Sequence, residues 1–350
     1  MLAVTFADLW FRARQFLIAV IGVGLVLAVA LAVTGLADGF HAEVQNFVDS
    51  TNASAWVMSK AAEGRVTPFA AFPAADAAAI ARQQGVRKAS PFVFAASQVA
   101  HVDGSASPTT VGLVGVAPGG LGNAPVVAGH GITGPGQAVA DDKVTSHVGS
   151  AIALGGHSFR VVGLVHGATM LGGVPSVYMT VPDVDQVVTG GKPLITAVLV
   201  QGIPAQVPAG LVVLTPADVV SDTMGQLKSA VSSINSTRVL MWIVAAAIVA
   251  SMLYVAALER KRDFAVLKAL GSSSRTLFLS LMLEAVVVTV LAALLAEVLA
   301  TVLTPAFAQP IDITADARLA LPLVAVVVGI VASVTALRRV TGADPAAAFG

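Results

Sequence analysis

The sequence predicts an α-helical membrane protein with four transmembrane helices and an α/β (α+β) extracytoplasmic domain inserted between the first and second spans. Three observations lead to this fold class. Hydrophobic residues make up 56% of the 350 residues and charged residues only 11%, which is too apolar for an ordinary soluble domain. Four segments are long and apolar enough to cross a bilayer core of roughly 30 Å as helices. Between the first two, charged residues, glycine and proline return.

The N-terminal segment, residues 1–15, places apolar side chains at roughly helical spacing with Asp8, Arg12 and Arg14 among them. This pattern predicts a short interfacial helix that leads into the first span, residues 16–37. A cleaved signal peptide is the alternative, but the apolar run is longer than the roughly 7–15 residues of a signal-peptide core.

The inserted region, residues 38–236, has apolar runs of strand length separated by glycine and proline, which is typical of a folded domain. Proline at a first helical turn and glycine after a last one mark its helices. We expect strands at 55–59, 86–102, 109–116, 158–165, 176–179, 194–201 and 211–214, and a further strand just before the Gly-Gly turn at 155–156. We expect helices at 73–84, at the start of 139–179, at 182–188 and at 215–236.

The C-terminal third contains the other three spans, at residues 239–258, 277–303 and 319–337. The third span includes Glu284 and Glu297, and the fourth span requires it for an even topology. Residues 259–275 connect the second and third spans, residues 304–318 form a short external loop, and residues 338–350 form a tail.

Basic residues predict the orientation of these spans. They precede the first span, fill the connection 259–275 and follow the fourth span at Arg338 and Arg339. By the positive-inside rule these segments are cytoplasmic, together with both termini, and residues 38–236 lie outside. We therefore expect a multi-pass membrane protein in contact with lipid. Abundant Ala, Val and Gly with little Lys suggest a bacterial source, so the membrane would be a bacterial plasma (inner) membrane.

Several classes of function are disfavoured by the sequence. A net charge of zero indicates no nucleic-acid partner, and the chain has no cysteine for disulfides or metal binding. No phosphate-binding P-loop and no G-x-S-x-G nucleophile motif occurs. The six histidines lack the spacing of H-E-x-x-H or H-x-x-E-H, so we expect neither a metal site nor catalysis.

Two carboxylates, Glu284 and Glu297, lie within the third span, where an ionised group costs several kcal/mol unless it faces protein, water or headgroups. On a helix they are about 140° apart, so they do not form one paired site. Glu284 would lie about 13 Å from Arg275 along the axis and Glu297 about 33 Å away, near opposite headgroup zones. We expect interfacial placement with local hydrogen bonds, and a proton or substrate relay and helix contacts are the alternatives.

The connection between the second and third spans combines charge with an apolar ridge. Residues 258–271 place Phe264, Leu267 and Leu270 among charged side chains, and Gly271 ends the pattern. Anchoring at lipid headgroups explains the basic residues. Docking of a protruding helix in a groove of a cytoplasmic partner explains the ridge as well, and the residues alone leave both interpretations open.

Residues 259–285, ERKRDFAVLKALGSSSRTLFLSLMLEA, resemble the signature of the MacB/FtsX-like ABC transporter permeases. The family pattern runs roughly E-R-[RK]-[RK]-E-[IF]-[GA]-[VIL]-L-[RK]-A-[LI]-G-[AS]-[ST], and a span beginning near L-x-E-A follows it. Asp263 and Ala265 depart mildly from it, because Glu and Gly are usual there. The matching positions are Glu259, Arg260, Lys261, Arg262, Leu267, Lys268, Ala269, Leu270, Gly271, Glu284 and Ala285.

Two further segments are similar to the family. The tail resembles its closing R-x-x-x-x-D-P-x-E-A-L, with Asp344 and Pro345 kept but Ala347 and Phe349 in place of Glu and Leu. The sequence FRVVG at residues 159–163 resembles an F-x-V-V-G strand of the family's external domain. With the order of the spans, the resemblance covers nearly the whole chain.

The resemblance implies a membrane subunit that is not itself an enzyme and binds no cofactor. It would act as a homodimer or paired permease with two cytoplasmic ABC ATPase subunits, which use ATP and Mg. Residues 259–271 would be the coupling helix seated on the ATPase, with a tail contact at Asp344 and Pro345. The predicted contact residues of this helix are Glu259, Arg260, Lys261, Arg262, Asp263, Phe264, Leu267, Lys268, Leu270 and Gly271.

In this family, movement of the spans drives the external domain for export, for lipoprotein or peptide handling, or for mechanotransmission to an external protein partner. Two alternatives remain: a permease that imports a nutrient, and a membrane-anchored scaffold or sensor without ATP coupling. Co-purification of an ATPase separates the scaffold from the other two.

Overall fold

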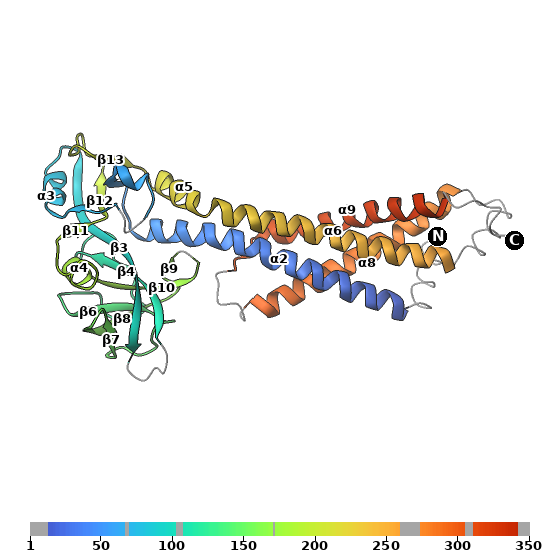
Figure 1. Cartoon of the computed structure of the whole chain (residues 1–350), viewed down its shortest axis with the longest axis horizontal. Coiled ribbons are helices and arrows are strands. Elements are labelled where there is room, and N and C mark those ends of the chain that lie inside the picture. Colours follow the sequence, from blue (N-terminus) through green and yellow to red (C-terminus); the bar gives the residue numbers. More distant parts are fainter. Residues whose placement is uncertain are drawn as a thin grey trace. The chain divides into compact units, whose positions relative to one another are not determined.

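The computed structural model describes residues 13–66, 70–102, 108–170, 172–259, 274–304 and 311–341. The chain divides into two compact units. Residues 40–229 form the inserted domain, and the segments on either side of it form the helical unit. Four helices of the helical unit are long and apolar enough to cross a membrane, and the inserted domain combines a sheet with short helices, so the predicted fold class is confirmed (Figure 1).

Long helices make up the helical unit, and short ones belong to the inserted domain. The first helix begins before the predicted first span and continues into the inserted domain. The long helices are α2 (Ala13–Ser50), α6 (Lys228–Glu259), α8 (Ser274–Leu303) and α9 (Ala315–Thr341). The short ones are η1 (Lys60–Ala62, a 3-10 helix), α3 (Ala75–Ala81), α4 (Val181–Thr189) and α5 (Pro216–Gln226).

The strands of the inserted domain form one large sheet and one small one, β11-β2. Strands β1, β3, β4 and β13 have the predicted bounds. The strands are β1 (Ala55–Ser59), β2 (Phe72–Pro73), β3 (Val86–Val102), β4 (Thr109–Val116), β5 (Ala128–Gly129), β6 (Gln137–Asp141), β7 (Ala151–Leu154), β8 (His157–Val165), β9 (Thr169–Met170), β10 (Val174–Thr180), β11 (Leu194–Ile195), β12 (Ala197–Gly202) and β13 (Leu211–Leu214).

Part of the large sheet closes into a ring. Its order is β13-β1-β12-β3-β4-β10-β6-β8-β5, and β7 pairs with both β3 and β8. The pairings therefore run β3-β4-β10-β6-β8-β7 and return to β3. β3 takes part twice because it is 17 residues long: its first half pairs with β12, and its end, from Val99 to Val102, pairs with β7.

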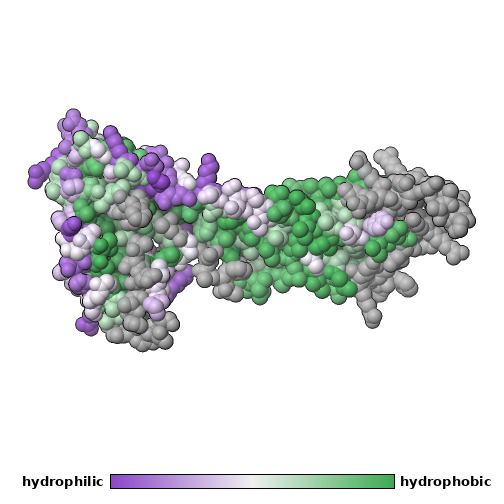
Figure 2. All heavy atoms as spheres, in the orientation of Figure 1, coloured by the Kyte–Doolittle hydropathy of each residue, from purple (hydrophilic) through white to green (hydrophobic). Residues whose placement is uncertain are grey.

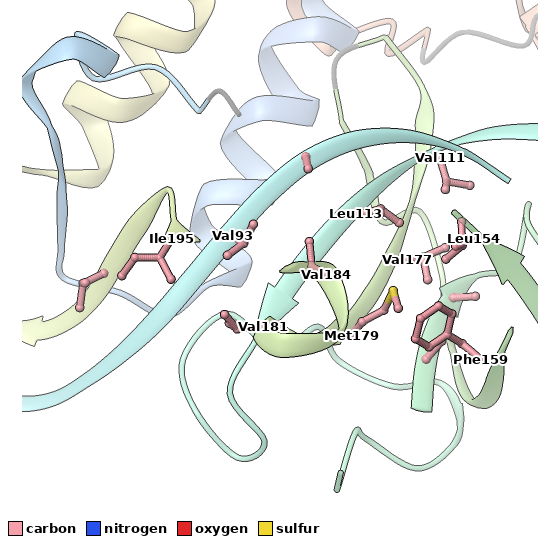
Figure 3. Packing of buried hydrophobic residues seen from close by; sticks show 14 of the residues in the cluster. Val93, Val111, Leu113, Leu154, Phe159, Val177, Met179, Val181, Val184 and Ile195 are labelled. Carbon is pink, nitrogen blue, oxygen red and sulfur yellow. The ribbon is translucent and has the colours of Figure 1, made fainter. Parts of the chain in front are cut away.

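Side chains of the sheet alternate between two apolar cores. Successive residues of a strand point to opposite faces, and on β3 Val93 and Ala95 join one core whereas Phe92 and Phe94 join the other. The first core takes side chains from all the ring strands and from α3 and α4. Figure 3 shows those of β3, β4, β7, β8, β10 and α4 among them. The second takes them from the end of α2 and from α5. Short helices therefore cover both faces of the sheet.

The sequence features that predict helix starts in the inserted domain correspond to N-terminal caps in the structure. Thr180 caps α4 and Thr215 caps α5, each accepting from the main-chain N–H three residues later, and each helix has proline at its first turn. The predicted helix at 215–236 is divided, because α5 ends at Gln226 and α6 begins at Lys228.

The short helix predicted at the start of 139–179 is wrong. Residues 137–141 form strand β6, which pairs with β10 on one side and β8 on the other. Ala138, Val139, Ala140 and Asp141 are all buried, so the segment lacks the alternation of a half-exposed strand. The predicted strand 194–201 is also divided, into β11 and β12, because Thr196 between them donates its hydroxyl to Phe92 O and accepts the N–H of Phe94.

Helices α2, α6, α8 and α9 share one apolar core. Small residues allow close approach within it: an added Cβ at Gly24 of α2 would lie 3.2 Å from the carbonyl oxygen of Ala292 on α8. At Gly329 of α9, an added Cβ would lie 2.8 Å from Thr289 Oγ1. Packing through small residues is the usual basis of helix association in a bilayer. The outer surface of this unit is strongly apolar, whereas the inserted domain presents polar residues (Figure 2).

Asp185 of α4 is a buried carboxylate in the inserted domain. It is 4% exposed, and burial raises its pKa from 3.8 to about 6, although a hydrogen bond from the main chain of Leu194 opposes the rise. The folded state therefore holds a proton that the unfolded state releases between about pH 4 and pH 6. The free energy of unfolding must fall as pH rises through this window.

We predict that Asp185→Asn weakens this pH dependence. Between pH 4 and pH 7 the free energy of unfolding of the wild type should fall by on the order of 2 kcal/mol more than that of the variant. The reason is that the folded variant has no proton to release at this position. Melting of the full chain in detergent at both pH values measures the change, and exposed Asp49→Asn is the control. The same pH dependence in the wild type and Asp185→Asn would contradict the assignment.

We predict that Gly24→Val destabilises the helical unit, whereas Gly22→Val has little effect. Both changes add the same branched side chain to α2, but an added Cβ at Gly22 meets nothing within 4 Å. The steric conflict at Gly24 should cost about 1–3 kcal/mol. Melting temperatures in detergent give the comparison, and equal effects of the two variants would exclude close packing of α2 on α8 at this position.

Candidate functional site

The predicted coupling helix lies almost wholly outside the described residues. The structure describes the two helices that flank it: α6 ends at Glu259 and α8 begins at Ser274. The predicted contact residues outside the described part are Arg260, Lys261, Arg262, Asp263, Phe264, Leu267, Lys268, Leu270, Gly271, Asp344 and Pro345. Their roles stay predictions.

The two flanking helices both enter the core of the helical unit. α6 contributes Ala245, Val249 and Leu253, and α8 contributes a row of alanines that includes Ala285 and Ala292. α2 and α9 pack into the same core. The helices on either side of this connection therefore share one core with α2 and α9.

Glu284 is buried among protein atoms. It is 1% exposed and lies on α8 next to Ala285, whose carbonyl oxygen accepts the hydroxyl of Thr289 at 2.9 Å. Protein atoms therefore cover this side chain, and its position near the inner headgroup zone stays a prediction. Burial against protein is one of the environments that make a carboxylate tolerable in a membrane span.

Glu297 has a different environment. Its carboxylate is 3.4 Å from Nε of Arg318 on α9, and the two side chains are 32% and 48% exposed. This half-exposed ion pair joins α8 to α9. The two carboxylates of α8 thus lie in separate environments, as their angular separation indicates.

A second link joins α2 to the segment that precedes α9. The carbonyl oxygen of Gly35 accepts the N–H of Asp312 at 2.9 Å, and the hydroxyl of Thr314 is 3.1 Å from Asp38 Oδ2. An added Cβ at Gly35 would lie 2.8 Å from Ile313. This close approach requires glycine, and it ties α2 to the segment between α8 and α9.

The end of α2 is built into the second core of the inserted domain. Val44, Phe47 and Val48 are at most 5% exposed. The ring of Phe47 makes edge contacts with Phe92 at 6.2 Å and with Phe94 at 6.1 Å between ring centroids. One helix therefore contributes to the cores of both units.

Glu43 connects the same helix end to a β-turn. Its carboxylate accepts the main-chain N–H groups of Gly172 and Gly173, each at 2.8 Å, in the turn between β9 and β10. The Glu43 side chain is 6% exposed. Neither glycine was singled out from the sequence. The spacing of Phe40, Val44, Phe47 and Val48 is helical, however, and could have indicated that α2 continues.

Asp141 is another buried carboxylate of the inserted domain, and it accepts hydrogen bonds from main-chain N–H groups. It accepts the N–H of Lys143 at 3.0 Å and that of Ala168 at 2.6 Å, while burial raises its pKa. Exposed His166 is 2.6 Å from Asp142, and this partner raises the pKa of His166. Within the described residues, His, Asp and Glu side chains do not gather in a group of three or more that could hold a metal ion.

Comparison with known families matches both parts of the chain. The family model described as FtsX-like permease C-terminal matches residues 236–345, and the one described as MacB-like periplasmic core domain matches residues 16–230. Two proteins of Mycobacterium tuberculosis H37Rv and one of Mycobacterium bovis, each described as an uncharacterized ABC transporter permease, are 37% identical over 350 residues. These matches cover 100% of this chain and 99% of each relative.

Two solved domains are similar to part of the chain. The periplasmic region of MacB from Actinobacillus actinomycetemcomitans aligns with a TM-score of 0.36 and 13% identity, covering 49% of this chain and 92% of that one. The extracellular domain of the ABC-type transporter YknZ from Gram-positive bacteria aligns with a TM-score of 0.34 and 13% identity, covering 46% of this chain and 98% of that one.

Proposed function

The chain belongs to the FtsX-like ABC transporter permeases with a MacB-like domain, and we propose that it couples ATP hydrolysis by a separate cytoplasmic ATPase to movement of its inserted domain. The observation that carries this proposal is the continuity of α2. This helix packs in the core of the helical unit through Val23 and Leu27 and in the second core of the inserted domain through Phe47. A displacement of the helical unit would therefore reach the domain through one element.

The ATPase would act on the connection between α6 and α8. The predicted coupling helix at 259–271 would dock on it through the apolar ridge of Phe264, Leu267 and Leu270, with Asp344 and Pro345 as a tail contact. A dimer of this chain, or a pair with a second permease, would carry two ATPase subunits. ATP and Mg would be bound by those subunits, and both termini of this chain would be cytoplasmic.

The moving part would be the inserted domain on the outer side of the membrane. Its movement suits export, lipoprotein or peptide handling, or activation of an external protein partner. Large parts of its surface are polar (Figure 2), and its fold depends on two apolar cores with no cysteine to cross-link them. Such a domain can move as a body while its internal packing stays intact.

We predict that Leu267→Asp and Gly271→Pro each abolish stimulation of the partner ATPase. The first places a charge in the docking ridge, and the second changes the backbone where the coupling helix is expected to end. ATP turnover of the complex reconstituted with the co-purifying ATPase measures the effect, and carbonate extraction verifies membrane insertion.

Ser272→Ala is the matched control, since it lies in the same connection but outside the ridge. It should keep normal stimulation. Normal ATP turnover in both Leu267→Asp and Gly271→Pro would contradict docking through this helix, and failure of any ATPase to co-purify would favour a scaffold or sensor.

A further inference from the structure

We propose that the carboxylate of Glu43 is the positioning contact through which α2 moves the turn between β9 and β10. We call this contact, made by Glu43 with the N–H groups of Gly172 and Gly173, the Glu43–turn contact. The inference rests on the proposed function for the movement of α2, whereas the geometry of the contact does not depend on that function. Through this contact, Glu43 converts a displacement of the helix into a displacement within the sheet.

The hydrogen bonds of this contact are of a kind that should resist separation of α2 from the turn. Two consecutive N–H groups point at one carboxylate, at 2.8 Å each, and the carboxylate is almost fully buried. Hydrogen bonds to an ionised acceptor are stronger than neutral ones, and withdrawal from water increases their electrostatic strength. Glu43 would lose both partners if α2 moved without the turn, which would leave a buried charge without donors.

The backbone of the turn has an unusual conformation that directs its N–H groups toward Glu43. Gly172 and Gly173 have φ of +95° and +83°, a conformation that residues with a side chain rarely adopt. An added Cβ at Gly172 would lie 3.6 Å from Cε1 of Phe40, one turn of helix before Glu43. Phe40 and Glu43, three residues apart on α2, therefore both lie beside the turn, and Glu43 accepts hydrogen bonds from it.

The turn leads directly into the closed ring of strands. Val174 and Pro175 pair with β9, and the following residues of β10 pair with β4 on one side and β6 on the other (Figure 1). β10 also supplies Val177 and Met179 to the first core. Force applied at Gly172 and Gly173 is thus applied to a strand inside the ring, on the opposite side of the sheet order from β12 and β1.

Hydrogen exchange of the full chain with its co-purifying ATPase in nanodiscs tests the proposal in two parts. Without nucleotide, Glu43→Gln should speed exchange in the peptide 169–175 by about tenfold, because the amide keeps one acceptor and turns an NH₂ toward the second glycine. Glu43→Asp, which keeps the charge but withdraws it by one methylene, should have the same effect. Gln45→Ala, on the same helix, should not.

With ATP and vanadate, wild-type exchange should change in both 40–50 and 169–175. In Glu43→Gln the nucleotide-dependent change in exchange should persist in the peptide 40–50 and be lost in the peptide 169–175. A residue that only stabilises the fold would not separate the two peptides in this way. A persistent change at the turn in both Glu43 variants overturns the inference alone. Unaltered exchange at the turn without nucleotide also overturns it, and the lack of any nucleotide effect in the wild type overturns the proposed function together with it.

Discussion

The main-chain hydrogen bonds of α2 run without interruption from Ala13 to Ser50, and the rest of the arrangement depends on them. No proline lies in this stretch, so every turn of the helix can keep its hydrogen bonds. Bending it sharply would break several of them, while its two ends are held in different apolar cores. The chain returns from the inserted domain to the helical unit through α5 and α6. Unlike α2, these are two separate helices, joined at Leu227.

The two units obtain their stability in different ways. Between helices in lipid there is little hydrophobic driving force, so close contact of small residues such as Gly24 with Ala292 replaces it. The inserted domain instead buries branched and aromatic side chains in two cores, one of them built around Trp56, Phe92 and Phe94. Each unit therefore has apolar cores of its own.

Much of this fold was predictable from periodicity and composition. The bounds of β3 and β4 follow from runs of strand length between glycine, proline and loop residues, and the spans follow from uncharged runs. Strand β6 was missed because burial on both faces removes alternation. Closure of the ring through β7 and the contact of Glu43 with a turn 129 residues away depend on pairing between distant segments, which a local pattern does not contain. The predicted coupling helix rests on the family resemblance and on its apolar ridge.

The closed ring also affects how copies of this domain meet one another. A sheet edge offers unpaired N–H and C=O groups to any other extended chain, and closure removes such edges from the ring strands. In the described part of the sheet, the ends of the pairing order are β13, with four residues, and β5, with two. Another extended chain therefore finds few places to start intermolecular β-pairing. This topology therefore leaves few strand edges for intermolecular pairing, even though the sequence of the domain is rich in valine.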